Sequence, residues 1–155
     1  MAFGTNSKIF SAFITDVLNN TTAMDMNSDT HKIALFGNSG TPDQTVASAS
    51  TAYNTGQWTT GNEVTATGWT ANGLALASVT SGFTSNVYTF DAADKAGGAT
   101  DTVTNAYGCL IYDDTITTPV ADQGICYLAF GGANSVVAGT FTVSFNASGI
   151  FALTL

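Results

Sequence analysis

The stretch that decides the fold is residues 139–155, GTFTVSFNASGIFALTL. Polar and apolar side chains alternate over residues 140–146 and again over residues 151–155, which is the pattern of half-buried strands. The Asn-Ala-Ser-Gly sequence between them is typical of a turn. We therefore predict that the two runs pair as a hairpin. If Phe151, Leu153 and Leu155 face a sheet interior, this end of the sequence is held in the core.

Several further strand-like runs precede this hairpin, each bounded by turn sequences. The two most apolar are TDTVTNAYGCLIYDD and GICYLAFGG, and the loop DDTITTPVADQ joins them. Residues 40–61 are rich in small residues and predict a long surface excursion with little regular structure. Short, separately bounded strands predict a mainly β fold, an antiparallel β-sandwich or jelly-roll-like barrel. The other predicted strands are KIALFG (32–37), NEVTATGW (62–69), GLALASVTSG (73–82) and SNVYTFDAADKAG (85–97).

One segment near the start has helical rather than strand spacing. Its apolar residues recur on one helical face: Ile9, Phe10, Phe13, Ile14 and Val17. Ser7 is a candidate N-cap, and the Asn-Asn pair at residues 19–20 can end the helix. This helix either packs on the sheet or docks on a neighbouring subunit. We predict one domain over residues 1–155, with an N-terminal arm or helix over residues 1–22 and a β-sandwich over residues 23–155.

The charge balance excludes two classes of partner. Three lysines and no arginine stand against eleven acidic residues, which gives a formal net charge of −8. Binding a phosphate backbone needs clustered Lys or Arg, so we expect no nucleic-acid binding. An anionic membrane is disfavoured for the same reason. Because no signal peptide and no run of about 20 apolar residues is present, we expect a soluble protein made in a cytoplasm.

The sequence offers little catalytic chemistry. His31 is the only histidine, and it precedes a strand without any nucleophile motif nearby. We interpret it as a partly exposed residue at a strand edge, and we predict no catalytic residue and no enzyme activity. Cys109 and Cys126 lack companion ligands for zinc. We expect them on neighbouring core strands as reduced thiols, with no cofactor and no assigned metal.

Two groups of acidic residues are candidate calcium sites. Asp25, Asn27 and Asp29 match the first ligands of an EF-hand loop, but the glycine and glutamate that such a loop needs are missing. We interpret these residues as turn and capping groups. Three more aspartates border the loop between the most apolar strands: Asp113, Asp114 and Asp122. They are predicted to be solvated turn residues, and calcium binding beside them stays an open alternative.

Aromatic residues in the Gly/Thr-rich region have two interpretations. Tyr53, Trp58 and Trp69 could bind a sugar or a protein partner, or they could fill the ends of a sandwich core. Trp69 follows an alternating run, which favours the core. For Tyr53 and Trp58 we favour surface contact.

Taken together, several segments resemble one family, the small structural proteins of tailed bacteriophages, labelled minor capsid or decoration proteins. The resemblance runs over nearly the whole chain and rests on KIALFGNSGTPDQ, AYNTGQW, NEVTATGW, LALAS, TFDAADKA, NAYGCLIYDDTITTPVADQGICYLAFGG and AGTFTVSFNASGIFALTL. It implies a capsid decoration (cement) protein that binds the outside of the assembled head and stabilises the shell. It supplies no catalytic residues.

The resemblance further implies the major capsid protein as partner, a virion location and a homo-oligomer, for which a trimer is favoured. The predicted contact segments are the N-terminal arm and the excursion at residues 40–61. Within them, the expected contact residues are Phe3, Phe10, Phe13, Tyr53 and Trp58. Two alternatives are a tail or head–tail connector component and a virion-surface carbohydrate-binding module that stacks sugars on Trp58 and Tyr53.

Overall fold

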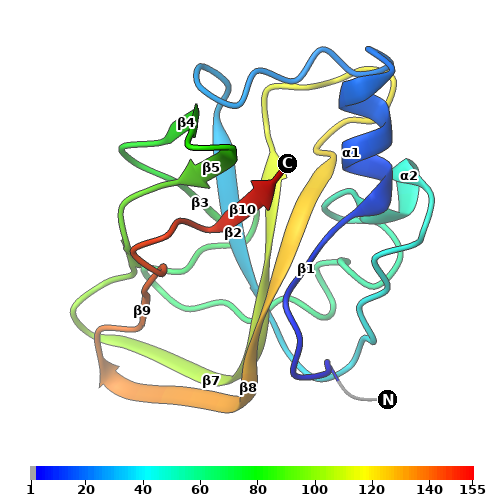
Figure 1. Cartoon of the computed structure of the whole chain (residues 1–155). Coiled ribbons are helices and arrows are strands. Elements are labelled where there is room, and N and C mark those ends of the chain that lie inside the picture. The colour runs from blue at the N-terminus through cyan, green and yellow to red at the C-terminus, as the bar shows by residue number, and fades with distance from the viewer. Residues whose placement is uncertain (1–2) are drawn as a thin grey trace.

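The computed structural model describes residues 3–155, which form a mainly β chain with antiparallel sheets (Figure 1). Strands account for 39% of the residues and helices for 8%, which confirms the predicted mainly β class in a β-sandwich-like form. The elements in chain order are β1 (Lys8–Ile9), α1 (Ser11–Leu18), β2 (His31–Phe36), α2 (Ser48–Thr51), β3 (Leu74–Ala75), β4 (Thr80–Thr84), β5 (Val87–Asp91), β6 (Lys95–Ala96), β7 (Asp101–Asp113), β8 (Gly124–Gly139), β9 (Thr142–Val143) and β10 (Phe151–Thr154).

The largest sheet, which we call sheet A, has the strand order β1-β8-β7-β2-β3. Its centre is built from near-continuous apolar runs, CLIY in β7, ICYL in β8 and IALF in β2, rather than from alternating ones. Such runs are typical of strands that are covered on both faces. The residues of these runs are buried, apart from Leu128, which is half-buried. Sheet A is therefore the middle layer of the molecule.

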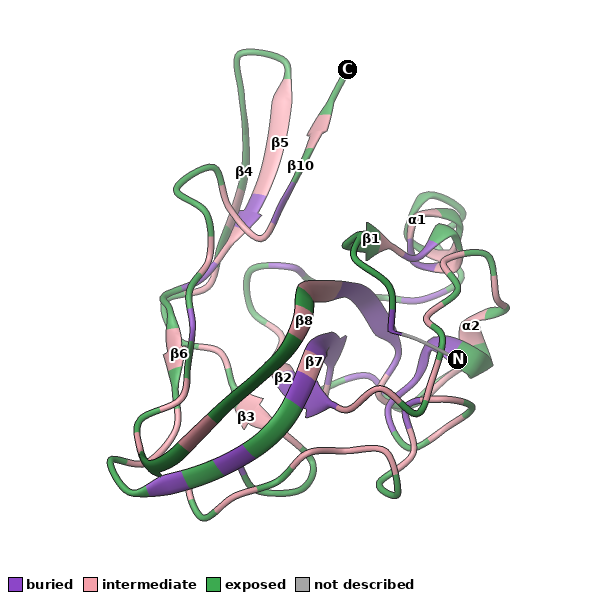
Figure 2. Ribbon diagram, turned by 90° about the horizontal axis from the view of Figure 1, so that it is seen from below, coloured by how far each residue is buried: buried purple, intermediate pink, exposed green. Residues whose placement is uncertain are grey.

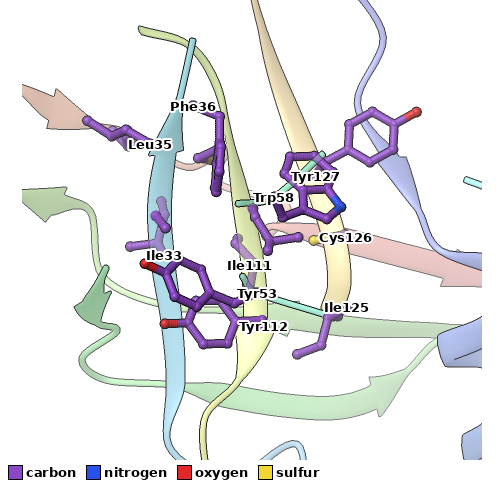
Figure 3. Close-up of a cluster of buried hydrophobic side chains, with 14 of the residues drawn as sticks. Ile33, Leu35, Phe36, Tyr53, Trp58, Ile111, Tyr112, Ile125, Cys126 and Tyr127 are labelled. Atoms are coloured by element: carbon purple, nitrogen blue, oxygen red, sulfur yellow. The ribbon is translucent and has the colours of Figure 1, made fainter. Parts of the chain in front are cut away.

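Strand register sorts the core of sheet A into two faces. Ile33 lies opposite Ile111, and Leu35 lies opposite Cys109, so these side chains share the face toward the second sheet. The other face carries Ala34, Phe36, Leu110, Tyr112, Ile125 and Tyr127. Its cover is built from the N-terminal segment and from the excursion after β2. Figure 3 shows Tyr53 and Trp58 of the excursion beside Tyr112 and Tyr127. At Gly108 the ring of Phe3 occupies the space that a Cβ would need, so this contact requires glycine.

The N-terminal segment differs in part from the predicted helix. Helix α1 begins at Ser11, and the residues before it form β1, in which Lys8 lies opposite Tyr127 of β8. The Phe10 N–H donates to the Ile125 carbonyl at 3.0 Å, which holds Phe10 in an extended conformation. Ser7 is not the N-cap; its Oγ accepts a hydrogen bond from the Ala129 N–H at 3.0 Å. The helix ends at Leu18 with Asn19 as its C-cap, in agreement with the prediction.

The excursion after β2 has little regular structure apart from α2, as predicted. The strand predicted at residues 62–69 is wrong, since only an isolated bridge between Phe36 and Glu63 forms there. The Val64 N–H still donates to the Leu35 carbonyl at 2.8 Å, but the chain then turns, and the Ala66 N–H donates to the Trp69 carbonyl. Trp69 is buried, which confirms its interpretation as a core residue.

The second layer is a three-stranded sheet, sheet B, with the order β10-β5-β4; a third sheet holds β6 and β9. This arrangement corrects the predicted hairpin of residues 140–155. In β10, Phe151 lies opposite Phe90 of β5, whereas β9 pairs with β6. Sheet B stands away from sheet A, with the β4–β5 turn and Leu155 at its far end (Figure 2). Phe151 is buried as expected, but Leu153 is half-buried and Leu155 is exposed.

Candidate interaction surface

The five residues predicted to contact a partner lie inside the chain's own core, which corrects that prediction. The exposed fraction is 1% for Trp58 and 0% for Phe10, and it stays below 8% for the other three, Phe3, Phe13 and Tyr53. Four of them fix the N-terminal segment and the excursion onto the outer face of sheet A. The fifth, Phe13 of α1, packs against Phe151 with ring centroids 6.2 Å apart. Side chains buried this way leave no surface for another protein.

Trp58 is the centre of this cover. Its ring meets the rings of Phe3, Phe10 and Phe36 edge to face, with centroids 5.1–6.1 Å apart. Edge-to-face packing of this kind adds about 0.5–1.5 kcal/mol per pair beyond the area buried. Composition predicts a surface loop at residues 40–61. The aromatic residues Tyr53 and Trp58 of that loop hold it against sheet A.

Tyr53 is fixed as firmly by polar contacts. Its ring stacks on Tyr112 at 5.1 Å with an interplanar angle of 15°. The Tyr53 hydroxyl donates to Glu63 Oε2 at 2.6 Å and accepts the Asn72 N–H at 2.8 Å. Burial and the bond to Glu63 raise the pKa of Tyr53 to about 12. The side chain therefore ties two loops together and is not free to stack on a sugar.

A cluster of exposed apolar side chains lies instead at the outer end of sheet B, which we call the tip (residues 82–88 and 153–155). Phe83, Tyr88 and Leu153 lie opposite one another across the three strands, so their side chains share one face. Phe83 is 55% exposed and Leu155 is 87% exposed. At the other end of the same face, Phe90 and Phe151 are buried against sheet A. One apolar face is thus covered at its base and open at its tip.

The tip also carries no charged side chain, in a chain whose net charge is −8. The β4–β5 turn, Ser85-Asn86, has positive φ at both residues, as expected for a tight hairpin turn. Small polar residues and exposed aromatic or aliphatic side chains therefore form one neutral surface. The sequence contains a signal for this surface, an uncharged run from residue 64 to residue 90, but strand prediction alone does not indicate which of its apolar residues stay exposed.

Sheet A and sheet B do not pack against each other along the β10 side of sheet B, where a groove separates them. A cavity of about 400 Å³ separates the base of β10 from β1 and β8, and Ile150, Phe151, Ile9 and Leu128 line it. A second cavity of about 270 Å³ shares Ser7, Leu128 and Ile150 with the first, so the two form one groove. The groove leaves room next to the outer side of β10.

The acidic loop does not gather its carboxylates into one site. Asp113 is buried, and its Oδ1 accepts the N–H groups of Thr115 and Ile116 at 2.8 and 3.2 Å. Asp114 forms an ion pair with Lys32 at 2.9 Å. The turn interpretation holds for Asp113, although this residue is buried rather than solvated. Within residues 3–155, no group of three or more His, Cys, Asp or Glu side chains is placed to hold a metal ion.

The loop before β2 also follows the turn interpretation. Asp25 Oδ1 accepts the N–H groups of Asn27 and Ser28, and Asp29 Oδ2 accepts the Asp25 N–H at 2.6 Å. These bonds close the turn that leads into β2.

His31 is buried, which corrects its interpretation as a partly exposed edge residue. Strand β2 lies between β7 and β3, and His31 lies opposite Asp113. The distance from His31 Nε2 to Asp113 Oδ2 is 3.6 Å, and both side chains are 0% exposed. Burial lowers the pKa of His31 and raises the pKa of Asp113 to about 7. The ring of Phe90 lies over His31 at 5.2 Å, so this pair sits where sheet B meets sheet A.

Cys109 and Cys126 are free and buried on the neighbouring strands β7 and β8, as predicted. Burial raises the pKa of both thiols, to about 12 for Cys126 and well above the ordinary value for Cys109. Both sulfurs are therefore part of the core.

No protein-family model, no curated protein and no solved structure matches this chain. Neither α1 nor α2, the helices of residues 3–155, is long and apolar enough to cross a membrane.

Proposed function

We propose that this chain is a structural protein of a tailed-bacteriophage virion, a decoration protein that binds the outer surface of the assembled head through the tip. The observation that carries the proposal is the exposed apolar tip, which has no charged side chain and stands on a well-packed base. The resemblance of the sequence segments to phage minor capsid proteins supplies the identity of the partner, the major capsid protein.

The arrangement suits binding better than catalysis. The one histidine and its partner Asp113 are fully buried, so neither can touch a substrate. Tyr53 and Trp58, the sugar-stacking residues of the carbohydrate-binding alternative, are buried as well. Leu18 of α1 and Val137 of β8 are exposed as well, but the exposed apolar side chains of the tip lie together on one sheet, and such clusters are typical of protein contact surfaces.

The mechanism is stabilisation of the assembled state by preferential binding. A protein that binds the closed shell but not the separated subunits shifts the equilibrium toward the shell. In the proposed complex, Phe83 and Leu155 enter an apolar depression between capsid subunits. Acidic residues elsewhere on the chain favour basic residues on the shell around that depression. Because each shell offers many equivalent junctions, weak individual contacts add up.

Co-sedimentation with heads that lack this protein tests the proposal. We expect wild-type chain to saturate at hundreds of copies per head and to raise the temperature at which heads break open. Phe83→Asp places a charge on the tip, and we expect it to weaken binding by at least about tenfold. Val137→Asp is the matched control, because Val137 is 79% exposed at the far end of β8. Equal binding by both variants, or no binding by wild-type chain, would overturn the proposal.

The number of copies of this chain in each virion distinguishes a connector component from a decoration protein. A tail or head–tail connector component saturates at about a dozen copies per particle, at one vertex, as expected for a closed ring. Quantitative gel analysis of purified virions gives this number directly.

A further inference from the structure

Strand β10 presents an open edge to solvent. It is the outermost strand of sheet B, and the Leu155 N–H donates to the Asn86 carbonyl at 2.9 Å. In an antiparallel ladder, backbone groups alternate between the two sides of a strand. The groups of Ala152 and Thr154 therefore point away from β5. Within residues 3–155, no hydrogen bond from another segment reaches the backbone of either residue.

The opposite edge of the same sheet is capped at one residue. In β4, Asn27 Oδ1 accepts both the backbone N–H and the hydroxyl of Ser81, at 2.9 and 3.0 Å. The edge strands of sheet A, β1 and β3, are only two residues long each. Short edges and capped edges are the usual defences against pairing with another chain. Strand β10, with four residues, is longer than β1 and β3, and no side chain among the described residues caps its backbone.

Its sequence lacks the other defences too. Residues 150–155, IFALTL, contain no charged residue, no proline and no glycine. Ala152 and Thr154 are exposed, and the groove along the base of β10 leaves space beside the strand. An uncharged edge of this kind is a template for strand addition, which indicates that another strand covers it in the functional protein.

We infer that the covering strand is β10 of a second copy of this chain, paired antiparallel about a two-fold axis at Leu153. In that arrangement Ala152 of each copy lies opposite Thr154 of the other. Every outward N–H of one strand then meets an outward carbonyl of its counterpart, because the edge is self-complementary in an isologous dimer. Leu153 of one copy lies directly opposite Leu153 of the other.

Charge favours a second copy at this site. Two chains of net charge −8 repel each other, so self-association is least costly where the surface is neutral. The tip, including β10 and the β4–β5 hairpin, carries no charged side chain; β8 is uncharged as well, but β10 is the strand of the uncharged regions whose outward backbone groups are unpaired in the part of the chain that the structure describes. The paired edge is short, which places the dimer among weak interfaces and makes it dependent on concentration.

The dimer also adds to the proposed function, because it enlarges the surface that would bind the capsid. The dimer can be tested without the capsid. Side chains opposite one another across antiparallel strands share a face, so both copies direct Phe83, Tyr88 and Leu153 to the same side. The joined sheets present one apolar surface of twice the area to the shell. A two-fold pair then replaces the three-fold assembly expected from the resemblance.

Sedimentation equilibrium of the purified full chain, without heads, tests the dimer. We expect the mass to rise from 15.9 kDa toward twice that value as concentration increases. Thr154→Lys adds an edge charge and should weaken the dimer by at least about tenfold. Thr84→Lys is the matched control, because Thr84 lies in the same row of sheet B but on the β4 edge. It should dimerise like the wild type.

Amide hydrogen exchange gives a second, local readout. Protection of Ala152 and Thr154 should increase with chain concentration, whereas protection of residues in β4 should not. A chain that stays monomeric at every concentration overturns the inference, and so does a dimer that both lysine variants form equally well. A trimer as the end state also overturns it. Because no heads are present, failure of the capsid proposal leaves this result unaffected.

Discussion

Sheet A and sheet B both contain strands rich in apolar residues, but sheet A buries these residues and sheet B leaves part of them exposed. In sheet A the central strands are covered on both faces, and Leu110, Ile111 and Ile125 are fully buried. In sheet B one face is covered only at its base, where Phe90 is 0% exposed, while Phe83 at the tip is 55% exposed. Stability is therefore concentrated in sheet A, and the tip of sheet B is free to serve contact. Substitutions in the two regions should have different consequences.

The largest expected effect is in the cover of sheet A. Trp58→Ala removes a fully buried ring that packs on Phe3, Phe10 and Phe36, and should lower the free energy of unfolding by about 3–5 kcal/mol. Urea denaturation followed by tyrosine and tryptophan fluorescence measures the change. A loss below about 1 kcal/mol would mean that the cover of sheet A contributes no more than an exposed loop does.

An intermediate effect is expected where the two sheets meet. The pKa of Asp113 is raised to about 7 in the folded chain, so the folded state keeps a proton that the unfolded state has already lost. Stability should therefore fall as pH rises, by about 1 kcal/mol between pH ~6.5 and ~8. The pKa of His31 is lowered in the folded chain, so below pH ~6.5 the unfolded state binds a proton at His31 more readily than the folded state does. His31 therefore lowers the stability as the pH falls.

Asp113→Asn separates the two contributions. The amide oxygen keeps the bonds to the N–H groups of Thr115 and Ile116, but the side chain no longer ionises. We expect the decline between pH ~6.5 and ~8 to disappear, and the loss toward acidic pH caused by His31 to become steeper, because Asp113 no longer opposes it. Urea unfolding at a series of pH values measures both limbs. If the variant still loses stability between pH ~6.5 and ~8, another titrating group is responsible for that loss.

The smallest effect is expected at the tip. Phe83→Ala removes an aromatic side chain of the same class as Trp58, yet it should change the free energy of unfolding by no more than about 0.5 kcal/mol. The same urea titration serves, and head binding provides the contrasting readout. A loss of several kcal/mol would show that the tip is packed in solution, and would remove the contrast between the two sheets.

The sequence predicts the strands of sheet A well, because apolar runs such as CLIY and ICYL leave few other structures open. It predicts pairing poorly. Alternation over residues 151–155 identifies a strand but not its partner, and the partner is β5 rather than the neighbouring run. Ile9 and Phe10 fit a strand as well as a helix, and the bond from the Phe10 N–H to Ile125 decides between them.

The candidate site was harder to predict for a related reason. Tyr53 and Trp58 lie in a segment of loop composition, and composition does not reveal that the loop folds back over sheet A. Their burial follows from long-range contacts with Tyr112 and Phe36. Conversely, Leu153 and Leu155 continue the alternation of a core strand beyond the point where the core ends. Which apolar residues remain exposed is decided by how far sheet B extends past sheet A.

The two buried thiols give the chain a built-in chemical reporter. Alkylating reagents attack the thiolate, and Cys109 and Cys126 hold their protons far above neutral pH in the middle of sheet A. Cys126 lines the cavity beside β10, but Cys109 does not, so labelling of Cys109 requires sheet A to open and its rate reports opening without any engineered probe. A cysteine introduced on the tip would meanwhile be the one readily reactive sulfur among residues 3–155. Site-specific cross-linking of the tip to a partner can therefore begin from the natural sequence, with both native cysteines retained.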